Sequence, residues 1–302
     1  MGKLNRQTKK LHAGTVGSLL SPSFLAGIAL SIAFGCILVS CHGRSGQTSH
    51  TAGETNQPDT RIEVRSSDGS FYGYCQKVSD DKGDVFDVFI VDPVRTAIQI
   101  NFRDETGQRI GSLKRLNEWM QSWRDELIFA TNGGMYAASG EPVGLFVSES
   151  QVIHALNLRD AEDEGNFFLK PNGVFAITAR GAFVVESTQY VSRSERERVV
   201  YATQSGPMLV ADGTIHPKFE KESHNLNIRS GVGINDLNQA VFAISEREVN
   251  FYDFANLFVT SLKCRNALYL DGFVSRMYLP ALERHDEDGD FAGIITVSKR
   301  RN

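Results

Sequence analysis

The sequence predicts an α+β fold: a single domain on a mixed or antiparallel β-sheet core, with a few inserted helices. Strand-like segments dominate the chain after residue 62, and only two or three segments carry apolar residues at helical spacing. No Pro-rich or Gly-rich break divides residues 62–302, and no repeat of fixed period occurs there. These residues are therefore expected to form one domain.

The expected elements in the first part of the domain follow from the spacing of apolar residues. Residues 71–74 and 85–91 are strand-like, and the second run is apolar enough to be buried on both faces. Residues 97–102 alternate between apolar and polar, which indicates a half-exposed strand. Residues 113–124 have the helical period, and residues 127–130 predict a short buried strand.

The rest of the domain is expected to contain more strands than helices. Two hairpins are expected, with turns at Glu149-Ser150 and Arg180-Gly181. Apolar runs predict strands, and apolar residues three or four apart predict helices. The expected strands are 143–147, 152–156, 173–177, 182–185, 202–210, 230–234, 239–244, 266–270 and 294–297, and the expected helices are 189–198 and 250–262.

Composition and charge exclude several classes of protein. The chain has 302 residues, of which 41% are hydrophobic and 23% are charged, and this rules out a disordered, collagen-like or coiled-coil chain. Acidic residues outnumber basic residues by 36 to 32, giving a net charge of −4. A nucleic-acid-binding protein normally carries a basic excess or stripe, so nucleic acid is not an expected partner.

The first 41 residues are expected to be an export signal rather than part of the fold. Four basic residues precede residue 11, no acidic residue occurs before residue 42, and residues 24–39 are nearly all apolar. A positively charged start followed by an apolar run is typical of a signal segment, and the basic residues keep that end in the cytoplasm. The polar stretch 42–61 is expected to be a flexible tether.

The end of the apolar run bears on how the protein is held at the membrane. Leu38-Val39-Ser40-Cys41 resembles a bacterial lipobox, in which Cys41 is lipidated and becomes the mature N-terminus. An uncleaved signal anchor and an ordinary cleaved signal are the alternatives. All three place residues 42–302 outside the cytoplasm, and the first two anchor them to the membrane from the periplasmic side.

Two cysteines lie in the expected domain. In an oxidising compartment Cys75 and Cys264 are able to form one disulfide, and the alternative is two buried free thiols. The sequence contains no CxxC, no HExxH and no paired histidine spacing, so neither a metal site nor a cofactor is expected.

Polar residues stand beside glycines where several expected strands end, and loops at strand ends are where binding and catalytic residues concentrate. Asn132 can exchange hydrogen bonds with sugar hydroxyls, and the Arg229 guanidinium suits a phosphate or a carboxylate. Asp271 ends a buried strand, a costly position for an acid unless it is paired or functional. Each loop taken alone is also compatible with an ordinary glycine turn. The residues singled out are Asn132, Gly133, Gly134, Glu141, Ser205, Arg229, Gly231, Asp271, Gly272 and Ser275.

Other titratable residues give weaker indications. Glu141 and Asp271 together would meet the minimum for glycoside chemistry, which needs two carboxylates. His216 and His224 are each either a general acid or base or an exposed loop histidine. The acidic run 286–290 lacks the EF-hand register and is read as a solvated loop rather than a calcium site.

Taken together and in order, these segments resemble the phosphodiester glycosidase family, which includes the lysosomal uncovering enzyme and many exported bacterial proteins. The resemblance spans about residues 72–298. The matching segments are Asn132-Gly-Gly-Met-Tyr136, Glu141-Pro-Val-Gly-Leu145, Asn172-Gly-Val-Phe175, Gln204-Ser-Gly-Pro-Met-Leu-Val210, Arg229-Ser-Gly-Val-Gly-Ile234 and Leu268-Tyr-Leu-Asp-Gly-Phe-Val-Ser275.

The resemblance implies hydrolysis of a sugar 1-phosphodiester, with cleavage between the anomeric carbon and the phosphate. It implies that Arg229 clamps the phosphate and that Asp271 or Glu141 stabilises an oxocarbenium-like centre. It also implies that Asn132 and Ser275 hold sugar hydroxyls or phosphate oxygens. The remaining residues expected to bind substrate are Gly133, Gly134, Ser205, Gly231 and Gly272.

One segment departs from the family pattern. The uncovering enzyme has a run of glycines between the Asp and the Ser, whereas Phe273 and Val274 replace two of them here. The family resemblance and the export signal together imply an exported hydrolase of sugar-phosphate diesters in envelope or exopolysaccharide material. The alternative is a non-catalytic envelope lipoprotein that binds glycans.

Overall fold

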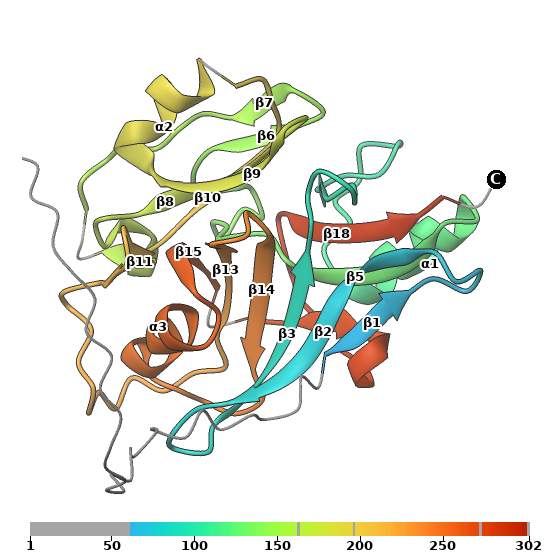
Figure 1. The fold of residues 1–302 in the computed structure, drawn as a ribbon. Coiled ribbons are helices and arrows are strands. Elements are labelled where there is room, and N and C mark those ends of the chain that lie inside the picture. The colour runs from blue at the N-terminus through green and yellow to red at the C-terminus, as the bar shows by residue number, and fades with distance from the viewer. Residues whose placement is uncertain (1–60, 162–163, 196, 272–273, 301–302) are drawn as a thin grey trace, which may run out of the picture. The chain divides into compact units, whose positions relative to one another are not determined.

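The computed structural model describes residues 61–161, 164–195, 197–271 and 274–300. Three antiparallel sheets make up most of it, and three α-helices are added to them (Figure 1). The sequence-based fold class is confirmed in part, because the fold is mostly β and the printed strand pairings within each sheet are antiparallel.

The largest sheet has eight strands and includes β15, the strand that ends at Asp271. Its strand β15 lies between β13 and β11, and Ser230 at the start of β13 pairs with Asp271 at the end of β15. In sheet order the strands are β1 (Ile62–Arg65), β2 (Phe71–Ser79), β3 (Val85–Val91), β14 (Ala240–Ser245), β13 (Ser230–Asn235), β15 (Cys264–Asp271), β11 (Met208–Ala211) and β12 (Thr214–Ile215).

Two five-stranded sheets complete the β structure. Both expected hairpins are present in the first of them, and residues 149 and 150 at its tight turn have φ angles of 50° and 66°. That sheet has the order β7 (Gln151–His154), β6 (Phe146–Ser148), β10 (Val199–Ser205), β8 (Gly173–Thr178) and β9 (Gly181–Glu186). The other has the order β17 (Arg284–His285), β16 (Met277–Leu279), β5 (Glu126–Asn132), β18 (Ile294–Lys299) and β4 (Gln99–Asn101).

Two of the described α-helices, α1 and α3, begin at polar residues whose side chains cap them. The Ser112 hydroxyl accepts a hydrogen bond from the Arg115 backbone N–H at 3.2 Å at the start of α1. Asn250 caps α3 in the same way. The α-helices are α1 (Leu113–Ser122), α2 (Ser187–Ser194) and α3 (Phe251–Thr260), and two short 3₁₀ helices lie at η2 (Asn166–Phe168) and η3 (Pro280–Leu282).

The eight-stranded sheet has a hydrophobic cluster on each face. On one face α3 packs Phe254 and Phe258 against β3, β14 and β15. On the other face the two smaller sheets pack against it, and the ring of Phe242 lies 5.0 Å from that of Phe129 and 5.8 Å from that of Phe175. Residues of all three sheets therefore share one core.

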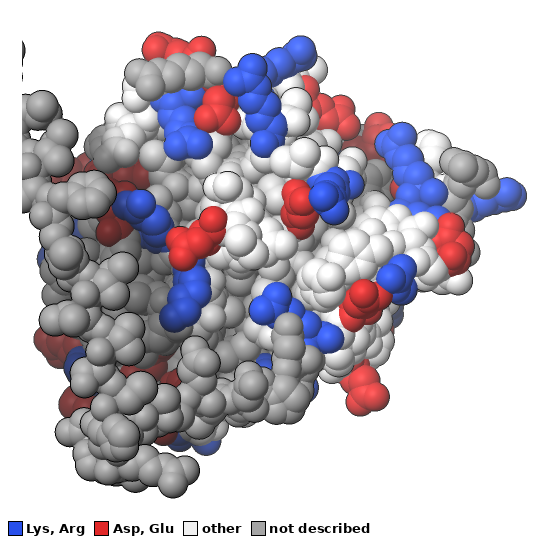
Figure 2. All heavy atoms as spheres, viewed as in Figure 1, with Lys and Arg blue, Asp and Glu red and all other residues white. Residues whose placement is uncertain are grey.

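Charged side chains of both signs are interspersed on the surface. On the face seen in Figure 2, blue and red atoms alternate over the described part of the chain without forming a broad basic stripe. Several of these charges are paired, as Arg103 is with Glu141 at 2.5 Å.

One expected strand is in fact two strands of different sheets. Residues 202–210 were expected to be continuous, but β10 ends at Ser205 and β11 begins at Met208. Gly206 and Pro207 separate them, and proline has no N–H to donate to a ladder. The chain thus crosses here from a five-stranded sheet to the eight-stranded sheet, which apolar periodicity cannot show.

The two cysteines do not form a disulfide. The sequence left a disulfide and two buried free thiols open, and the structure has Cys75 and Cys264 both free and buried. Their strands, β2 and β15, are four places apart in the sheet, about 19 Å at the usual strand spacing of about 4.8 Å. A disulfide requires Cα atoms within about 7 Å. The two thiols also belong to clusters on opposite faces.

Both thiols are expected to resist alkylation. Burial raises the pKa of Cys75 to about 11 and that of Cys264 to about 12, and the reactive thiolate is therefore scarce at neutral pH. In a chain with Cys36 and Cys41 changed to Ser, iodoacetamide should label no cysteine at pH 8 until denaturant is added, and should then label both. Labelling that needs a reductant as well as denaturant would show that a disulfide exists.

The expected signal, its lipidated Cys41 and most of the tether lie outside the described residues. Among the helices that the structure describes, none has the length and apolar character needed to cross a membrane.

Candidate active site

A cleft of about 580 Å³ opens at the end of β15, and we call it the Asp271 cleft. Asp271 is the last residue of that strand and is 8% exposed. The cleft walls come from segments far apart in sequence. They are Met135–Ala138 and Val143 after β5, Glu164 and Asn166–Phe168 around η2, Asn227 before β13, and Tyr269, Asp271 and Val274 around the end of β15.

Two carboxylates line this cleft. Asp271 lies at the strand end, and Glu164 lies on the η2 segment, where its carboxylate accepts a hydrogen bond from Arg159 at 2.7 Å. Among the described residues that form the walls, none is a lysine or an arginine. The described cleft wall therefore includes two acids, the number that glycoside chemistry needs, and no lysine or arginine to meet a phosphate.

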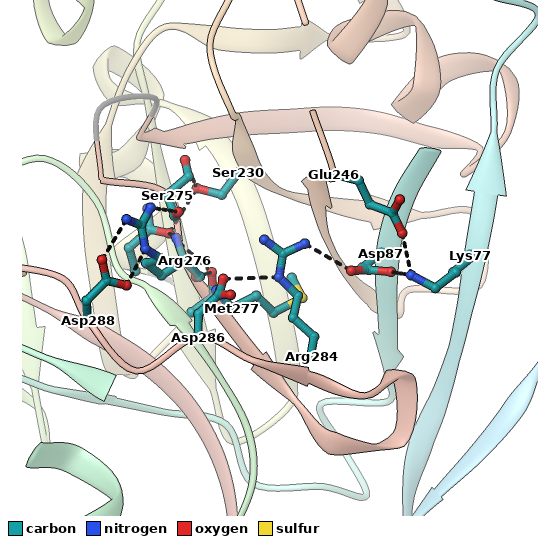
Figure 3. A network of polar contacts seen from close by, with 12 residues as sticks. Lys77, Asp87, Ser230, Glu246, Ser275, Arg276, Met277, Arg284, Asp286 and Asp288 are labelled. Carbon is teal, nitrogen blue, oxygen red and sulfur yellow. Dashed lines mark hydrogen bonds and ion pairs between the residues drawn. The ribbon is translucent and has the colours of Figure 1, made fainter. Parts of the chain in front are cut away.

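A buried polar cluster holds the strand end in place. The Ser230 hydroxyl donates to the Asn132 side-chain oxygen at 3.0 Å and lies 3.3 Å from the Asp271 carbonyl oxygen. Ser275 donates to that same carbonyl and lies 3.0 Å from the Ser230 hydroxyl, as Figure 3 shows for the two serines. Asn132 and Ser275 were both expected to hold the substrate. The structure brings them together next to Asp271, but both are buried and neither is among the residues that line the cleft.

Asn132 has a hydrogen-bond donor to spare. Its side-chain oxygen accepts from Ser230 and from the Arg276 backbone N–H at 3.3 Å, and these bonds fix which way the amide points. Its Nδ2 atom is buried and has no hydrogen-bond partner among the described residues. Leaving such a group unpaired costs about 1–3 kcal/mol, so Nδ2 is available to an acceptor that the structure does not contain.

Arg229 does not line the cleft. It is fully buried, and its guanidinium donates to the Val249 carbonyl at 2.8 Å and to the Asn225 carbonyl at 2.7 Å. A third bond runs from Nη1 to the Tyr269 hydroxyl at 3.0 Å. The guanidinium carbon lies 3.6 Å from the centre of the Phe251 ring. The resemblance implies a direct phosphate clamp, whereas the structure places Arg229 behind Tyr269.

Glu141 also lies away from the pair of acids. It sits in a short turn in which the Ala137 N–H donates to the Glu141 carbonyl, and Ala137 forms part of the cleft wall. The Glu141 carboxylate, however, pairs with exposed Arg103 and is not part of that wall. The expected meeting of Glu141, Arg229 and Asp271 in one cleft is therefore wrong for the first two side chains.

The small residues predicted to bind substrate have packing roles in the structure. A Cβ on Gly134, whose φ is 109°, would lie 2.6 Å from the Thr203 hydroxyl. A Cβ on Gly133 would lie 2.9 Å from the Gly293 backbone, and one on Gly231 would lie 3.0 Å from the Leu268 carbonyl. The Ser205 hydroxyl donates to the Leu270 carbonyl at 3.1 Å. Gly272 lies outside the described residues.

The histidines and the acidic run take structural or surface positions. His216 is buried, its Nε2 lies 2.8 Å from the Lys170 carbonyl, and its ring stacks on Phe219. His224 is exposed. Asp288 of the acidic run pairs with Arg276. Across the part of the chain that the structure describes, no three His, Cys, Asp or Glu side chains gather in a way that could hold a metal.

Ion pairs brace the segment that leads out of the cleft. The Met277 N–H donates to Asp286 at 2.9 Å, and Arg284 bridges Asp286 and Asp87 (Figure 3). Asp87 is buried on β3 and also accepts from Lys77 at 2.7 Å. Because β16 begins at Met277, this chain of contacts ties the segment after Asp271 to the centre of the eight-stranded sheet.

Sequence reasoning missed Glu164 and Tyr269. Nothing around Glu164 differs from an ordinary acidic loop, so only its position in space reveals it. Tyr269 did carry a signal, because residues two apart on a strand face the same side and Asp271 was already a candidate.

Comparison with known proteins shows the family to which the chain belongs. The model of the phosphodiester glycosidase family matches residues 125–295, more than half of the chain. The uncharacterized protein YigE of Escherichia coli strain K12 is 36% identical over 212 residues, which are 70% of this chain and 81% of that protein.

Among solved structures, one has a similar fold and one matches with a lower score. The catalytic domain of zebrafish N-acetylglucosamine-1-phosphodiester alpha-N-acetylglucosaminidase, auto-inhibited by its pro-peptide, superposes with a TM-score of 0.54 at 14% identity, covering 80% of this chain and 88% of that one. A protein from Synechocystis gives a TM-score of 0.49 at 12% identity, covering 76% of this chain and 62% of that one. With the segments that build the Asp271 cleft inside the matched region, the chain belongs to the phosphodiester glycosidase family.

Proposed function

We propose that this protein is an exported hydrolase that cleaves the bond between a sugar's anomeric carbon and a phosphodiester, on envelope or exopolysaccharide material. The observation that carries the proposal is the position of Asp271. Asp271 ends an inner strand of a phosphodiester glycosidase domain and lines a cleft large enough for a sugar ring. Ligand sites commonly have about 300–1,000 Å³.

The chemistry follows from what surrounds that carboxylate. As the bond from the anomeric carbon to the phosphate oxygen lengthens, positive charge grows on the sugar, and Asp271 is the described carboxylate at the strand end that can stabilise it. The phosphate departs as a phosphomonoester, which is already a good leaving group, and water adds to the anomeric carbon.

We propose that Glu164 is the second acid of the site, in place of Glu141. Glu164→Gln is expected to lower kcat/KM on a sugar 1-phosphodiester by about 10²-fold, the effect of losing one general acid or base. Glu141→Gln is the matched control, because Glu141 is also paired with an arginine but does not line the cleft, and it should stay within about threefold of wild type. Steady-state kinetics of the two purified variants test this. A larger loss of kcat/KM in Glu141→Gln than in Glu164→Gln would indicate that Glu141 is the second acid.

The experiment that tests the function is an assay of both products. The purified protein is incubated with sugar 1-phosphodiesters that differ in the sugar and in the alcohol. Release of reducing sugar and phosphomonoester in equal amounts supports the proposal. Release of a sugar 1-phosphate instead would show cleavage on the other side of the phosphorus.

Export and anchoring form part of this proposal. Residues 1–41 have the charge and apolar pattern of a signal, and Cys41 would carry the lipid that holds the domain at the membrane. Fractionation of cells and metabolic labelling with a fatty acid test this. A Cys41→Ala variant that stays labelled would contradict lipidation.

A non-catalytic glycan-binding role is the second candidate, and Val274 favours it. The uncovering-enzyme pattern has glycine there, whereas here the Val274 side chain is part of the cleft wall. A glycan that binds with a measurable Kd in calorimetry, while no phosphodiester is turned over, would favour this role.

A further inference from the structure

A phosphodiester is an anion, and a site that binds one normally presents donors or cations to it. The described walls of the Asp271 cleft contain two carboxylates and no lysine or arginine. The guanidinium of Arg229 is buried and does not line the cleft, and it donates a hydrogen bond to the hydroxyl of Tyr269, which does line it.

We infer that the Tyr269 hydroxyl donates a hydrogen bond to a phosphate oxygen of the ligand, and that buried Arg229 is the positioning residue that orients and polarises this hydroxyl. The inference rests on the proposed function, and it names the group that recognises the phosphate.

The direction of the hydrogen bond supports this assignment. A guanidinium has no acceptor, so Arg229 donates and the phenol oxygen of Tyr269 accepts at 3.0 Å. The proton of the phenol must then point elsewhere. Within the described part of the chain, no hydrogen bond donated by Tyr269 occurs. The residue is 0% exposed and lies among those that line the cleft.

The charge of Arg229 is directed at that phenol. Its other described acceptors are the neutral oxygens of Val249 and Asn225, and no described carboxylate forms an ion pair with it. Burial lowers the pKa of Arg229, and the interaction with Tyr269 acts the other way. A cation without a buried counter-ion strengthens the donor capacity of the hydroxyl that it contacts.

Tyr269 remains a proton donor at neutral pH. Burial raises the pKa of Tyr269, and Asp271 adds to the rise, while Arg229 opposes it without reversing it. The phenol is therefore neutral over the working pH range, so it contributes a hydrogen bond and does not become an anion that would repel phosphate.

The geometry of β15 places this donor beside the proposed catalytic carboxylate. Tyr269 and Asp271 both line the cleft, although the register of β15 with β13 shifts between these two residues. Phe251 fixes the pair from behind, because its ring lies 4.7 Å from the Tyr269 ring and 3.6 Å from the Arg229 guanidinium carbon. The sheet thus presents an acid for the sugar and a donor for the phosphate side by side.

The test compares Tyr269→Phe with Tyr190→Phe. Tyr190 is also buried, but it lies on α2 and has no part in the cleft, so it controls for loss of a buried hydroxyl. A hydrogen bond to a charged group contributes about 1.5–3 kcal/mol, so Tyr269→Phe should raise the Kd for inorganic phosphate by about 10-fold or more in calorimetry. Tyr190→Phe should leave it within about twofold of wild type.

A double-mutant cycle tests the part of Arg229. Arg229→Gln should weaken phosphate binding in wild type and have little further effect in the Tyr269→Phe background, because Arg229 acts through that hydroxyl. If Arg229→Gln does not fold, Arg229→Lys replaces it, since lysine keeps the charge but cannot form the same fork of bonds. An equal loss in both backgrounds would show that Arg229 binds the ligand directly and would overturn its role.

Turnover and binding separate this inference from the proposed function. Phosphate binding that depends on Tyr269, without turnover of any phosphodiester, would support the inference and reject the hydrolase. Turnover by wild type and by Tyr269→Phe at equal kcat/KM, with equal phosphate Kd, would overturn the inference and leave the hydrolase standing. A wild-type protein that binds no phosphate at millimolar concentration would overturn it as well.

Discussion

Replacing Asp271 with Asn is expected to lower kcat/KM on a sugar 1-phosphodiester by at least about 10²-fold, the usual effect of losing one catalytic group. The amide keeps the shape of the side chain but removes the negative charge that stabilises the sugar cation. Because the bond from Ser275 goes to the backbone carbonyl of Asp271, which the substitution leaves unchanged, the strand end should keep its structure. Steady-state kinetics and circular dichroism check the two halves of this prediction.

Asp92→Asn is the matched control for this experiment. Asp92 lies outside the cleft in an exposed pair with Arg95, so kcat/KM should change by less than about twofold. If Asp271→Asn retains wild-type turnover while the protein is folded, the catalytic assignment fails and the non-catalytic alternative gains support.

Replacing Asp87 with Asn is expected to lower the free energy of unfolding by about 3 kcal/mol, as when one partner of a buried ion pair is removed. Asp87 is buried and accepts from both Lys77 and Arg284, and Arg284 is only 17% exposed. The substitution leaves that guanidinium with a weaker partner in a dry environment. Urea denaturation measures the loss.

Glu63→Gln is the comparison for Asp87. Its pair with Arg65 is about half exposed on both sides, and such pairs contribute between about 0 and 1 kcal/mol. Equal effects of the two substitutions would mean that the contacts joining β3 to β16 and β17 do not stabilise the fold. If Asp87→Asn lowers kcat as well as stability, the contacts of Asp87, Arg284 and Asp286 also hold the segment after Asp271 in place.

Much of the fold could be predicted from local patterns because strand burial and helix amphipathicity are properties of neighbouring residues. The run Val85–Val91 and the two hairpins were found in this way. Which sheet a strand joins depends on distant partners. This is why the break at Gly206-Pro207 and the separation of the two cysteines were missed.

The candidate site was predictable where chemistry and strand position coincide. Asp271, Asn132 and Ser275 lie together, as their positions near strand ends indicated. Arg229 could not be placed, because a strand-entry arginine looks the same in sequence whether it faces a cleft or stacks on Phe251. For Glu141 the partner Arg103 lies 38 residues away along the chain, and no local pattern predicts that pairing.

The most direct test of the central claim is which bond to the bridging oxygen breaks. Hydrolysis of a sugar 1-phosphodiester in heavy-oxygen water, followed by mass spectrometry of both products, answers this. We expect the heavy oxygen in the anomeric hydroxyl of the sugar, because the Asp271 cleft is proposed to stabilise a cation at that carbon. Heavy oxygen in the phosphate instead would mean attack at phosphorus, and it would contradict the account.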